Sequence, residues 1–390
     1  MQHSRLLILL STILVLGVFG TAAILYARGY RLDKDNLEIL PSGLLVANSE
    51  PNGVQVYIDG ELKTATDNTI NLPPGTHDLL LKKEGYISWQ KRIEIEKEIV
   101  TQIDAFLPPI APSLTALTFS GAINPQTSPD RSKIAYAIPS NGDNIEKAGL
   151  WVIDFTNLPL GFNRDPRRVT DGDLNNPEDG WEWSPDGREI LLTTNNGVFL
   201  LDSGEFTPQS QRVNVASQLT EIEQQWEEKK EKLLLSQIAR LQDEIEEIFA
   251  DSAEGIEFSP DGDKILYAAT RDTTIPEGVV QQLPGASTQA QEREIKPGNK
   301  YVYDIKEDRN FKVAEPEQTI YWLPNSLNLL IPKEDSIEIL DYDGTNARAI
   351  FPGNYNFPHA FPSSTLDRVL ILTNLGFENS NSNLYWVSLR

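Results

Sequence analysis

The most distinctive pattern in the chain is a turn motif that recurs, each time followed by an apolar run. Ser-Pro-Asp-Gly precedes "EILLTT" at 189–194 and "KILYAA" at 264–269, and a looser copy, "SPDRSKIAYA", stands at 128–137. In such a turn, proline fixes φ, aspartate caps the backbone and glycine supplies a positive φ. The runs that follow are expected to be buried strands. The copies therefore indicate a repeated structural unit rather than a repeated catalytic site.

Two weaker copies begin at Leu323 and Phe361 and extend the repeat toward the end of the chain. Their prolines, Pro324 and Pro362, have a spacing close to the ~40–45 residues of a four-stranded propeller blade. The pattern predicts a β-propeller of about five blades over 114–390, with six blades as the alternative. Because a propeller must protect its edges, we expect "SLTALTF" at 113–119 to share the closing blade with the C-terminal "LYWVSL".

These repeats resemble the TolB-like, or WD40-like, β-propeller family. The resemblance rests on "SPDRSKIAYA", "GLWVIDF" and "PRRVTDG", and then on the two Ser-Pro-Asp-Gly copies. It covers most of 114–390 and implies a rigid surface lined by loops.

One segment, 215–255, interrupts the strand pattern with helical spacing. It contains no proline or glycine until its end, and its apolar positions recur every three or four residues. The phase shifts near Leu233–Leu235, which predicts a turn between two helices. We expect a hairpin that packs on itself and protrudes from one blade, and a second insertion, 274–299, that forms a long exposed loop. The residues expected to pair are Leu219, Ile222 and Trp226 on the first arm and Ile238, Leu241 and Ile245 on the second.

Residues 42–107 show strict alternation of a different kind. Val54, Val56 and Ile58 fall on one face of a predicted strand, with polar side chains between them. Asp59-Gly60 is a hairpin signal, and "PPG" at 73–75 marks another turn. The pattern predicts a small antiparallel β-domain with one exposed and one buried face.

This stretch resembles the PEGA domain, a small β-domain of bacterial surface and membrane proteins. The matching residues are "PNGVQVYIDG" at 51–60, "LPPGTHDLLLKKEGY" at 72–86 and Trp89. Val54 stands where the family usually has alanine. The resemblance implies a module without catalytic activity, usually outside the membrane or attached to it.

The N-terminal pattern is uniformly apolar. After a short tail, 1–5, residues 6–27 carry no charge and are long enough for the ~20-residue helix that crosses a bilayer. A cleaved signal peptide is the alternative, but its apolar core is usually only ~7–15 residues long. We therefore expect a single-pass anchor, a polar tether at 28–41 and, after the β-domain, a proline-rich linker at 108–113. The flanking charges do not favour an outward C-terminus, but the two recognised modules are typically exported.

Composition narrows the partners. The formal charge of −23 disfavours nucleic acid, because such a surface repels phosphate. The chain has no cysteine, so disulfides, thiolate metal sites and cysteine nucleophiles are excluded.

Candidate catalytic chemistry is sparse. The histidines are His3, His77 and His359, and no metalloprotease motif, serine elbow or phosphate-binding loop accompanies them. We expect no catalytic residues, no cofactor and no metal site.

One loop offers an alternative to the metal-free expectation. "DGDLNNPEDGWE" at 171–182 has the oxygen-ligand spacing of a calcium loop, although Asn176 replaces the usual glycine. A plain turn beside a blade strand is the competing interpretation. The five candidate ligands are Asp171, Asp173, Asn175, Asp179 and Glu182.

Together these features predict a membrane-anchored binding or scaffolding protein of the bacterial cell envelope, with a protein partner. Two alternatives stay open: a binder of envelope glycan or peptide, and a propeller-type hydrolase. The seven tryptophans suit either sugar stacking or core packing, and their recurrence at equivalent blade positions favours packing.

Overall fold

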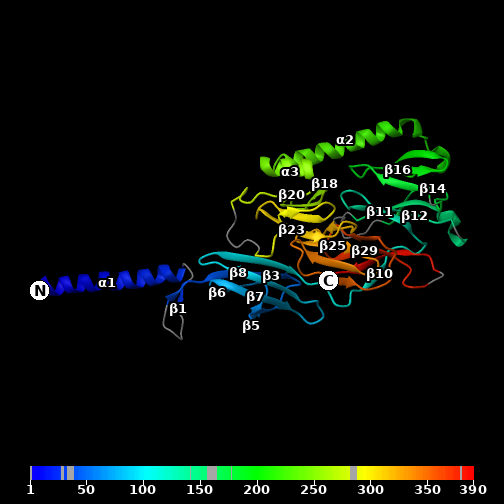
Figure 1. The fold of residues 1–390 in the computed structure, drawn as a ribbon. Coiled ribbons are helices and arrows are strands. Elements are labelled where there is room, and N and C mark those ends of the chain that lie inside the picture. Colours follow the sequence, from blue (N-terminus) through cyan, green and yellow to red (C-terminus); the bar gives the residue numbers. More distant parts are fainter. Residues whose placement is uncertain are drawn as a thin grey trace. The chain divides into compact units, whose positions relative to one another are not determined.

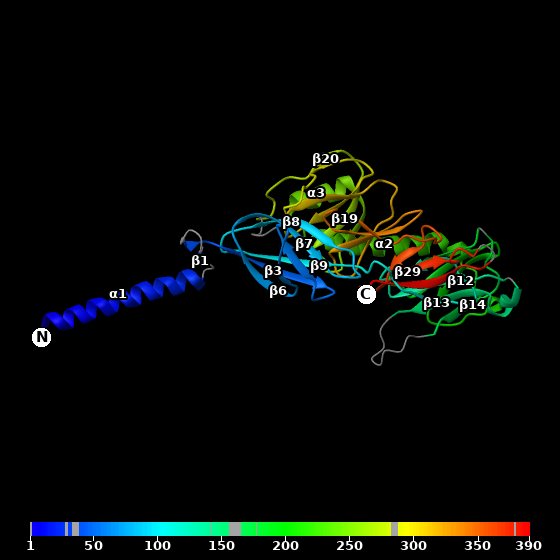
Figure 2. The ribbon, with the colours of Figure 1, turned by 90° about the horizontal axis from the view of Figure 1, so that it is seen from below.

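The computed structural model describes residues 2–27, 30–32, 39–140, 142–155, 165–176, 178–281, 288–377 and 380–390. The chain divides into two compact units (Figures 1 and 2). Unit 1 comprises Met1–Leu107 together with Gln281–Ala290, and unit 2 comprises Pro108–Val280 and Gln291–Arg390.

Unit 1 begins with the apolar helix α1, Gln2–Ala27. Its segment Leu9–Tyr26 is long and apolar enough to cross a membrane, and none of that segment is buried within the structure. The predicted tether contains a short antiparallel pair, β1 (Arg31–Leu32) with β2 (Ile39–Leu40). Residues 28–29 and 33–38 of this predicted tether lie outside the described residues.

The rest of unit 1 is a β-domain of two sheets. One sheet has the strand order β6-β3-β9 and the other has the order β5-β4-β7-β8. The strands are β3 (Gly43–Glu50), β4 (Gln55–Ile58), β5 (Glu61–Ala65), β6 (Asn68–Leu72), β7 (Gly75–Lys82), β8 (Trp89–Ile95) and β9 (Val100–Phe106).

The core of this domain confirms the alternation seen in the sequence. Val54, Val56 and Ile58 are buried against strands of both sheets. Asp59 and Gly60 both have positive φ and form the turn between β4 and β5. One feature differs from the antiparallel prediction, because β3 and β9 pair in parallel. Parallel neighbours need a long crossover, and the four-stranded sheet supplies it here.

Unit 2 contains five β-sheets of three or four strands arranged as blades (Figure 1), besides one two-stranded sheet. Each blade is antiparallel, and most neighbouring strands follow one another in the chain. Blade 1 is β11 (Ile123–Thr127), β12 (Lys133–Ile138), β13 (Gly149–Asp154) and β14 (Arg167–Asp171); blade 2 is β15 (Gly180–Trp183), β16 (Glu189–Thr194) and β17 (Gly197–Asp202). Blade 3 is β18 (Ala253–Phe258), β19 (Lys264–Ala269), β22 (Lys300–Asp304) and β23 (Arg309–Ala314). Blade 4 is β24 (Tyr321–Trp322), β25 (Asn328–Pro332), β26 (Ile337–Asp341) and β27 (Arg348–Phe351).

Blade 5 joins the two ends of the propeller segment, as the sequence predicted. It consists of β28 (Ala360–Pro362), β29 (Arg368–Thr373), β30 (Asn383–Ser388) and the early strand β10 (Leu114–Ala116). β10 pairs antiparallel with β30, with Thr115 opposite Trp386. One apolar cluster joins blades 5 and 1, with Leu370 and Leu372 of β29 packed with side chains of β12 and β13. The propeller therefore has five described blades.

The repeated Ser-Pro-Asp motif is a structural turn. In blade 2 the Ser184 hydroxyl donates to Asp186 at 2.7 Å and accepts the backbone N–H of Glu189 at 2.9 Å. The same serine-to-aspartate bond recurs in blades 1 and 3. Gly187 and Gly262 have φ values of 65° and 76°, which a glycine adopts without strain.

Two copies place larger residues at this strained position, and both residues reach other blades. Arg131 has a φ of 58° and donates to the backbone oxygen of Trp322 at 2.7 Å; it also pairs with Glu257. Ser326, also at 58°, accepts the N–H of Asp261 at 3.0 Å. Blade 1 is thereby tied to blades 3 and 4, and blade 4 to blade 3.

Two helices lie within residues 215–252, and 253–255 already belong to β18, but the predicted self-packed protrusion is wrong. Helix α2 (Leu219–Ile238) continues through the expected turn, and α3 (Asp243–Ser252) follows it. The two predicted arms also belong to different clusters. Leu219, Ile222 and Trp226 pack on blade 2, whereas Ile238, Leu241 and Ile245 pack on blade 3. Figure 1 shows α2 extending from the side of β16 to the side of β18. Helical spacing revealed an apolar face without revealing which surface covers it.

The insertion at 274–299 is less exposed than predicted. Its ends form a short antiparallel pair, β20 (Thr273–Thr274) with β21 (Glu294–Ile295). Ile275 and Ile295 are buried in the core of blade 3. Asp308 accepts the N–H groups of Gly278 and Val279 at 2.8 and 3.1 Å. These contacts hold the base of the insertion on the blade, and residues 282–287 lie outside the described part of the chain.

Candidate functional site

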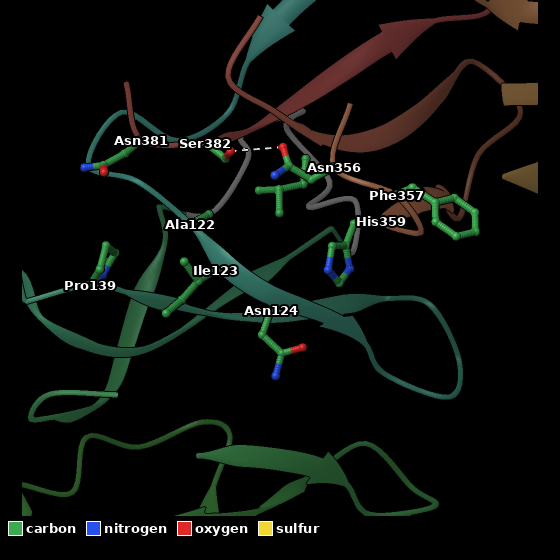
Figure 3. Close-up of a pocket in the computed structure, with 10 residues that line it drawn as sticks. Ala122, Ile123, Asn124, Pro139, Asn356, Phe357, His359, Asn381 and Ser382 are labelled. Carbon is green, nitrogen blue, oxygen red and sulfur yellow. Dashed lines mark hydrogen bonds between the residues drawn. The ribbon is translucent and has the colours of Figure 1, made fainter. Parts of the chain in front are cut away.

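A pocket of about 260 Å³ lies between blades 5 and 1 (Figure 3). Five segments build it: the start of β11, the end of β12, the connection before β28, the end of β29, and the connection before β30. The lining residues are Ala122, Ile123, Asn124, Pro139, Asn356, Phe357, His359, Leu372, Asn381 and Ser382.

The polar groups of the pocket are neutral. Ser382 donates its hydroxyl to the side-chain oxygen of Asn356 at 3.0 Å, the bond drawn in Figure 3. Burial lowers the pKa of His359, so its ring is uncharged near neutral pH. Asn124 and Asn381 add two more amides, and an amide both donates and accepts hydrogen bonds. The lining thus offers several neutral hydrogen-bonding groups.

Exposed apolar side chains stand on the same connections and form what we call the rim: Phe119, Ile145, Phe357, Leu375 and Phe377. Phe119 and Phe377 have 83% and 67% of their surface exposed. The connections are linked to one another, since Asn144 donates to the backbone oxygen of Ser120 at 2.8 Å. Isolated exposed apolar residues are common on proteins, but several of them on connections that also line a pocket indicate a binding surface.

The structure separates the histidines considered from the sequence. His359 lines the pocket. His77 lies in unit 1, where its ring nitrogens contact Asp59 Oδ2 at 2.7 Å and the backbone oxygen of Pro73 at 2.9 Å, which is a structural role. Its partner carboxyl, Asp59, has its pKa lowered by that hydrogen bond. His3 belongs to α1, and its side chain is outside the described part.

The candidate calcium ligands are spread over two blades. Asp171 ends β14 and accepts the N–H of Gln209 at 2.5 Å, while Glu182 lies on β15. Asp173 accepts the N–H of Asn175 at 3.2 Å, and Asp179 accepts that of Asn176 at 3.3 Å. Three of the carboxylates thus cap backbone N–H groups. Among the described residues, which omit Pro177 of this loop, no group of three or more acidic or histidine side chains is placed to hold a metal ion.

The tryptophans of the inner strands pack in the core. Trp183 of blade 2 donates its indole N–H to the backbone oxygen of Gln126 in blade 1 at 3.1 Å. Trp322 of blade 4 makes the equivalent bond to Glu257 in blade 3 at 3.3 Å. Both are buried, so they stabilise contacts between blades and are not available to stack on sugars.

Sequence reasoning found only one pocket residue, His359. The others come from connections around positions 122, 357 and 381, which are far apart in the chain and carry no motif. One signal was present: the short stretch "NSNSN" at 379–383 concentrates amides in a single connection. The ring closure that brings them together had been predicted, but the strand register that aligns them had not.

The PEGA domain family matches residues 42–111, so the chain carries a PEGA domain there, beginning where the sequence placed it. No curated protein sequence matches the chain.

Solved structures similar to the chain include β-propellers. They are a putative TolB from Agrobacterium tumefaciens (13% identity, TM-score 0.22, 68% of this chain and 78% of that one) and TolB from Acinetobacter baumannii (12%, 0.20, 80% and 59%). Another is the Cps50 (Swd1) β-propeller domain from Myceliophteria thermophila (11%, 0.26, 70% and 85%). The propeller assignment itself follows from the strand order of the five sheets.

Proposed function

We propose that this chain is a membrane-anchored, non-catalytic binding protein of the cell envelope that captures a protein partner with the pocket and rim of its propeller. The observation that carries the proposal is the neutral pocket, whose connections also carry exposed apolar side chains. The PEGA domain and the propeller are both compatible with a binding or scaffold role. The apolar helix α1 is suited to anchoring the chain in a membrane.

The pocket chemistry favours binding over hydrolysis. Ser382 and His359 both line it, but the Ser382 hydroxyl donates to Asn356. A nucleophilic serine needs its hydroxyl bonded to a base, and that base oriented by a third group. The ten lining residues include no carboxylate to orient the histidine. The geometry therefore supports recognition of a partner.

Site-specific photo-cross-linking tests the binding role. We place p-benzoylphenylalanine at Phe357 in the rim and, as a matched control, at Phe206 on blade 2, because the two side chains are 47% and 50% exposed. We expect irradiation of native membranes to give one discrete adduct from position 357 and none from position 206. Equal adducts from both positions, or none from position 357, would refute the proposal.

Cysteine labelling tests the envelope location. The chain has no native cysteine, so a single introduced thiol is the only one to react. Ser88 in unit 1 and Ser210 in unit 2 are exposed and suit replacement by cysteine. We expect an impermeant maleimide to label Ser88→Cys and Ser210→Cys on spheroplasts whose cytoplasmic membrane is intact. Labelling only after the cytoplasmic membrane is lysed would place the domains inside.

A further inference from the structure

The size of the pocket limits what it can hold. Small-molecule and cofactor sites usually measure ~300–1,000 Å³ and enclose most of their ligand. At about 260 Å³, this pocket is smaller, and the rim extends the contact surface beyond it. Such a site suits one side chain of a larger ligand, with the neighbouring parts of that ligand lying on the rim.

The polarity of the pocket limits the charge of that ligand. None of the ten lining side chains carries a charge near neutral pH, although the whole chain has a formal charge of −23. A charged group buried here would lose its hydration without gaining a partner of opposite charge. An acidic ligand would in addition be repelled by the acidic protein.

The arrangement of the polar and apolar groups distinguishes a peptide from a sugar. Asn124 and Asn356 both line the pocket, and their amides can pair with the N–H and C=O groups of a peptide backbone. The rim residues Phe119 and Phe377 have no polar atom in their side chains and stand, exposed, on two of the connections that meet at the pocket. A sugar ring confined to the pocket would leave them uncovered, whereas a peptide segment that continues along these connections can contact them.

We infer that the pocket binds one apolar side chain, with its flanking backbone, from an uncharged peptide segment. This inference rests on the proposed function and names the part of the partner that is recognised. The buried side chain provides the apolar contact, and the asparagine amides fix the direction of the segment. Rim residues then contact the neighbouring side chains, as in interfaces where a central anchor is surrounded by contacts that exclude water.

Peptide selection tests this inference without knowledge of the natural partner. The full chain, immobilised in detergent micelles, is used to select from a displayed library of random heptapeptides with Gly-Ser flanks. Asn381 is exposed and lines the pocket, so Asn381→Trp blocks the site with little disturbance of the core. Asn195→Trp, in the exposed turn between β16 and β17, is the matched control. Equal melting temperatures of the two variants show that both are folded.

We expect uncharged sequences with a central Phe, Trp, Leu or Met to be enriched at least tenfold on the native chain. The same sequences should be enriched on Asn195→Trp and not on Asn381→Trp. Enrichment of charged sequences, equal enrichment on both variants, or no enrichment at all would overturn the inference. If position 357 still cross-links to a partner in that case, the proposed function stands and only the peptide assignment fails. If peptides are selected but position 357 gives no cross-link, the pocket binds peptides and the proposed capture of a protein partner fails.

Discussion

The two junctions on either side of blade 2, with blade 1 and with blade 3, are packed in different ways. Blades 1 and 2 pack strand on strand, with Leu150 and Val152 against Ile190 and Leu192 in one apolar cluster. The opposite face of blade 2, with Leu191 and its neighbours, packs on the first half of α2 instead. The face of blade 3 that is turned away from blade 4 packs on the end of α2 and on α3. The helical segment thus supplies core contacts that strands supply elsewhere.

The comparison teaches that an insertion in a repeat can be part of the core. Phe249 of α3 is 1% exposed and contacts Tyr267 edge-on at 4.8 Å between ring centres. Tyr303 lies at 6.0 Å from the same ring. An insertion that only lay on the surface would leave exposed side chains where it meets the blade. Here the side chains of α3 that face blade 3 are among the most buried in unit 2. We call residues 215–252 the wedge.

Deleting the wedge should produce the largest effect. Replacing 215–252 with Asn-Gly uncovers apolar faces of blades 2 and 3, including Tyr267 and Tyr301, which are almost fully buried. We expect a chain that is insoluble or that lacks a cooperative thermal transition, because the lost contacts include several large side chains. A soluble deletion variant that melts cooperatively near the native temperature would show that the wedge is dispensable.

The double variant Leu233→Ser and Leu235→Ser serves as the control for that deletion. Both side chains lie on the wedge but are exposed, so we expect a change in the free energy of unfolding within about 0.5 kcal/mol. A loss of several kcal/mol would mean that this part of α2 is covered in solution.

Truncation of single aromatic residues compares the two positions directly. Phe249→Ala should lower the free energy of unfolding by about 3–5 kcal/mol, the usual cost of removing a buried phenylalanine. Phe199→Ala, at the contact of blades 1 and 2, should cost slightly less, since that ring is 8% exposed. Urea titration followed by tryptophan fluorescence measures both. If Phe249→Ala alone lowered the free energy of unfolding by less than about 1 kcal/mol, the wedge would contribute little to the core, and the strands would form it by themselves.

Substitution of Arg131 should change the free energy of unfolding by less, and the difference between two variants tests whether the backbone is strained there. Arg131→Ala removes the hydrogen bond to Trp322 and the pairing with Glu257, and it keeps the positive φ of 58°. Arg131→Gly removes the same contacts but relieves the strain. We expect both to destabilise the protein, the alanine variant by about 1 kcal/mol more than the glycine variant. Equal unfolding midpoints for the two variants would show that the backbone is not strained at this turn.

The smallest expected effect concerns pH. The Ser184 hydroxyl lowers the pKa of Asp186, so the folded state favours the carboxylate. This contribution is present above the ordinary carboxyl pKa of about 3.9 and is lost as the pH falls through the lower folded value. The stability gap between the native chain and Asp186→Asn should therefore narrow from pH 6 to pH 3 in thermal melts. A gap that widens over this range would contradict the assignment.

The sequence predicted the elements whose cause is local. Alternation located the strand with Val54, Val56 and Ile58, and the turn chemistry of the Ser-Pro-Asp motif located the second strands of blades 1, 2 and 3. Prediction from the sequence failed where contacts between distant parts of the chain determine the packing. The apolar side chains of α2 are spaced as in a coiled coil, yet blades cover them. The pocket depends on the register between connections that are more than 200 residues apart, and no local pattern encodes that register.

The pairing of β10 with β30 also has a consequence for synthesis. Leu384 donates its N–H to Thr118 across 266 positions of the chain. A ribosome adds about 5–20 residues per second, so β10 has no partner for roughly 15–50 s after it is made. During that time, blades 1 to 4 can form in order while the pocket does not exist. During this interval β10 has an unpaired edge, so it is the strand most prone to pair with a wrong partner. A chaperone that acts during translation has its clearest target there.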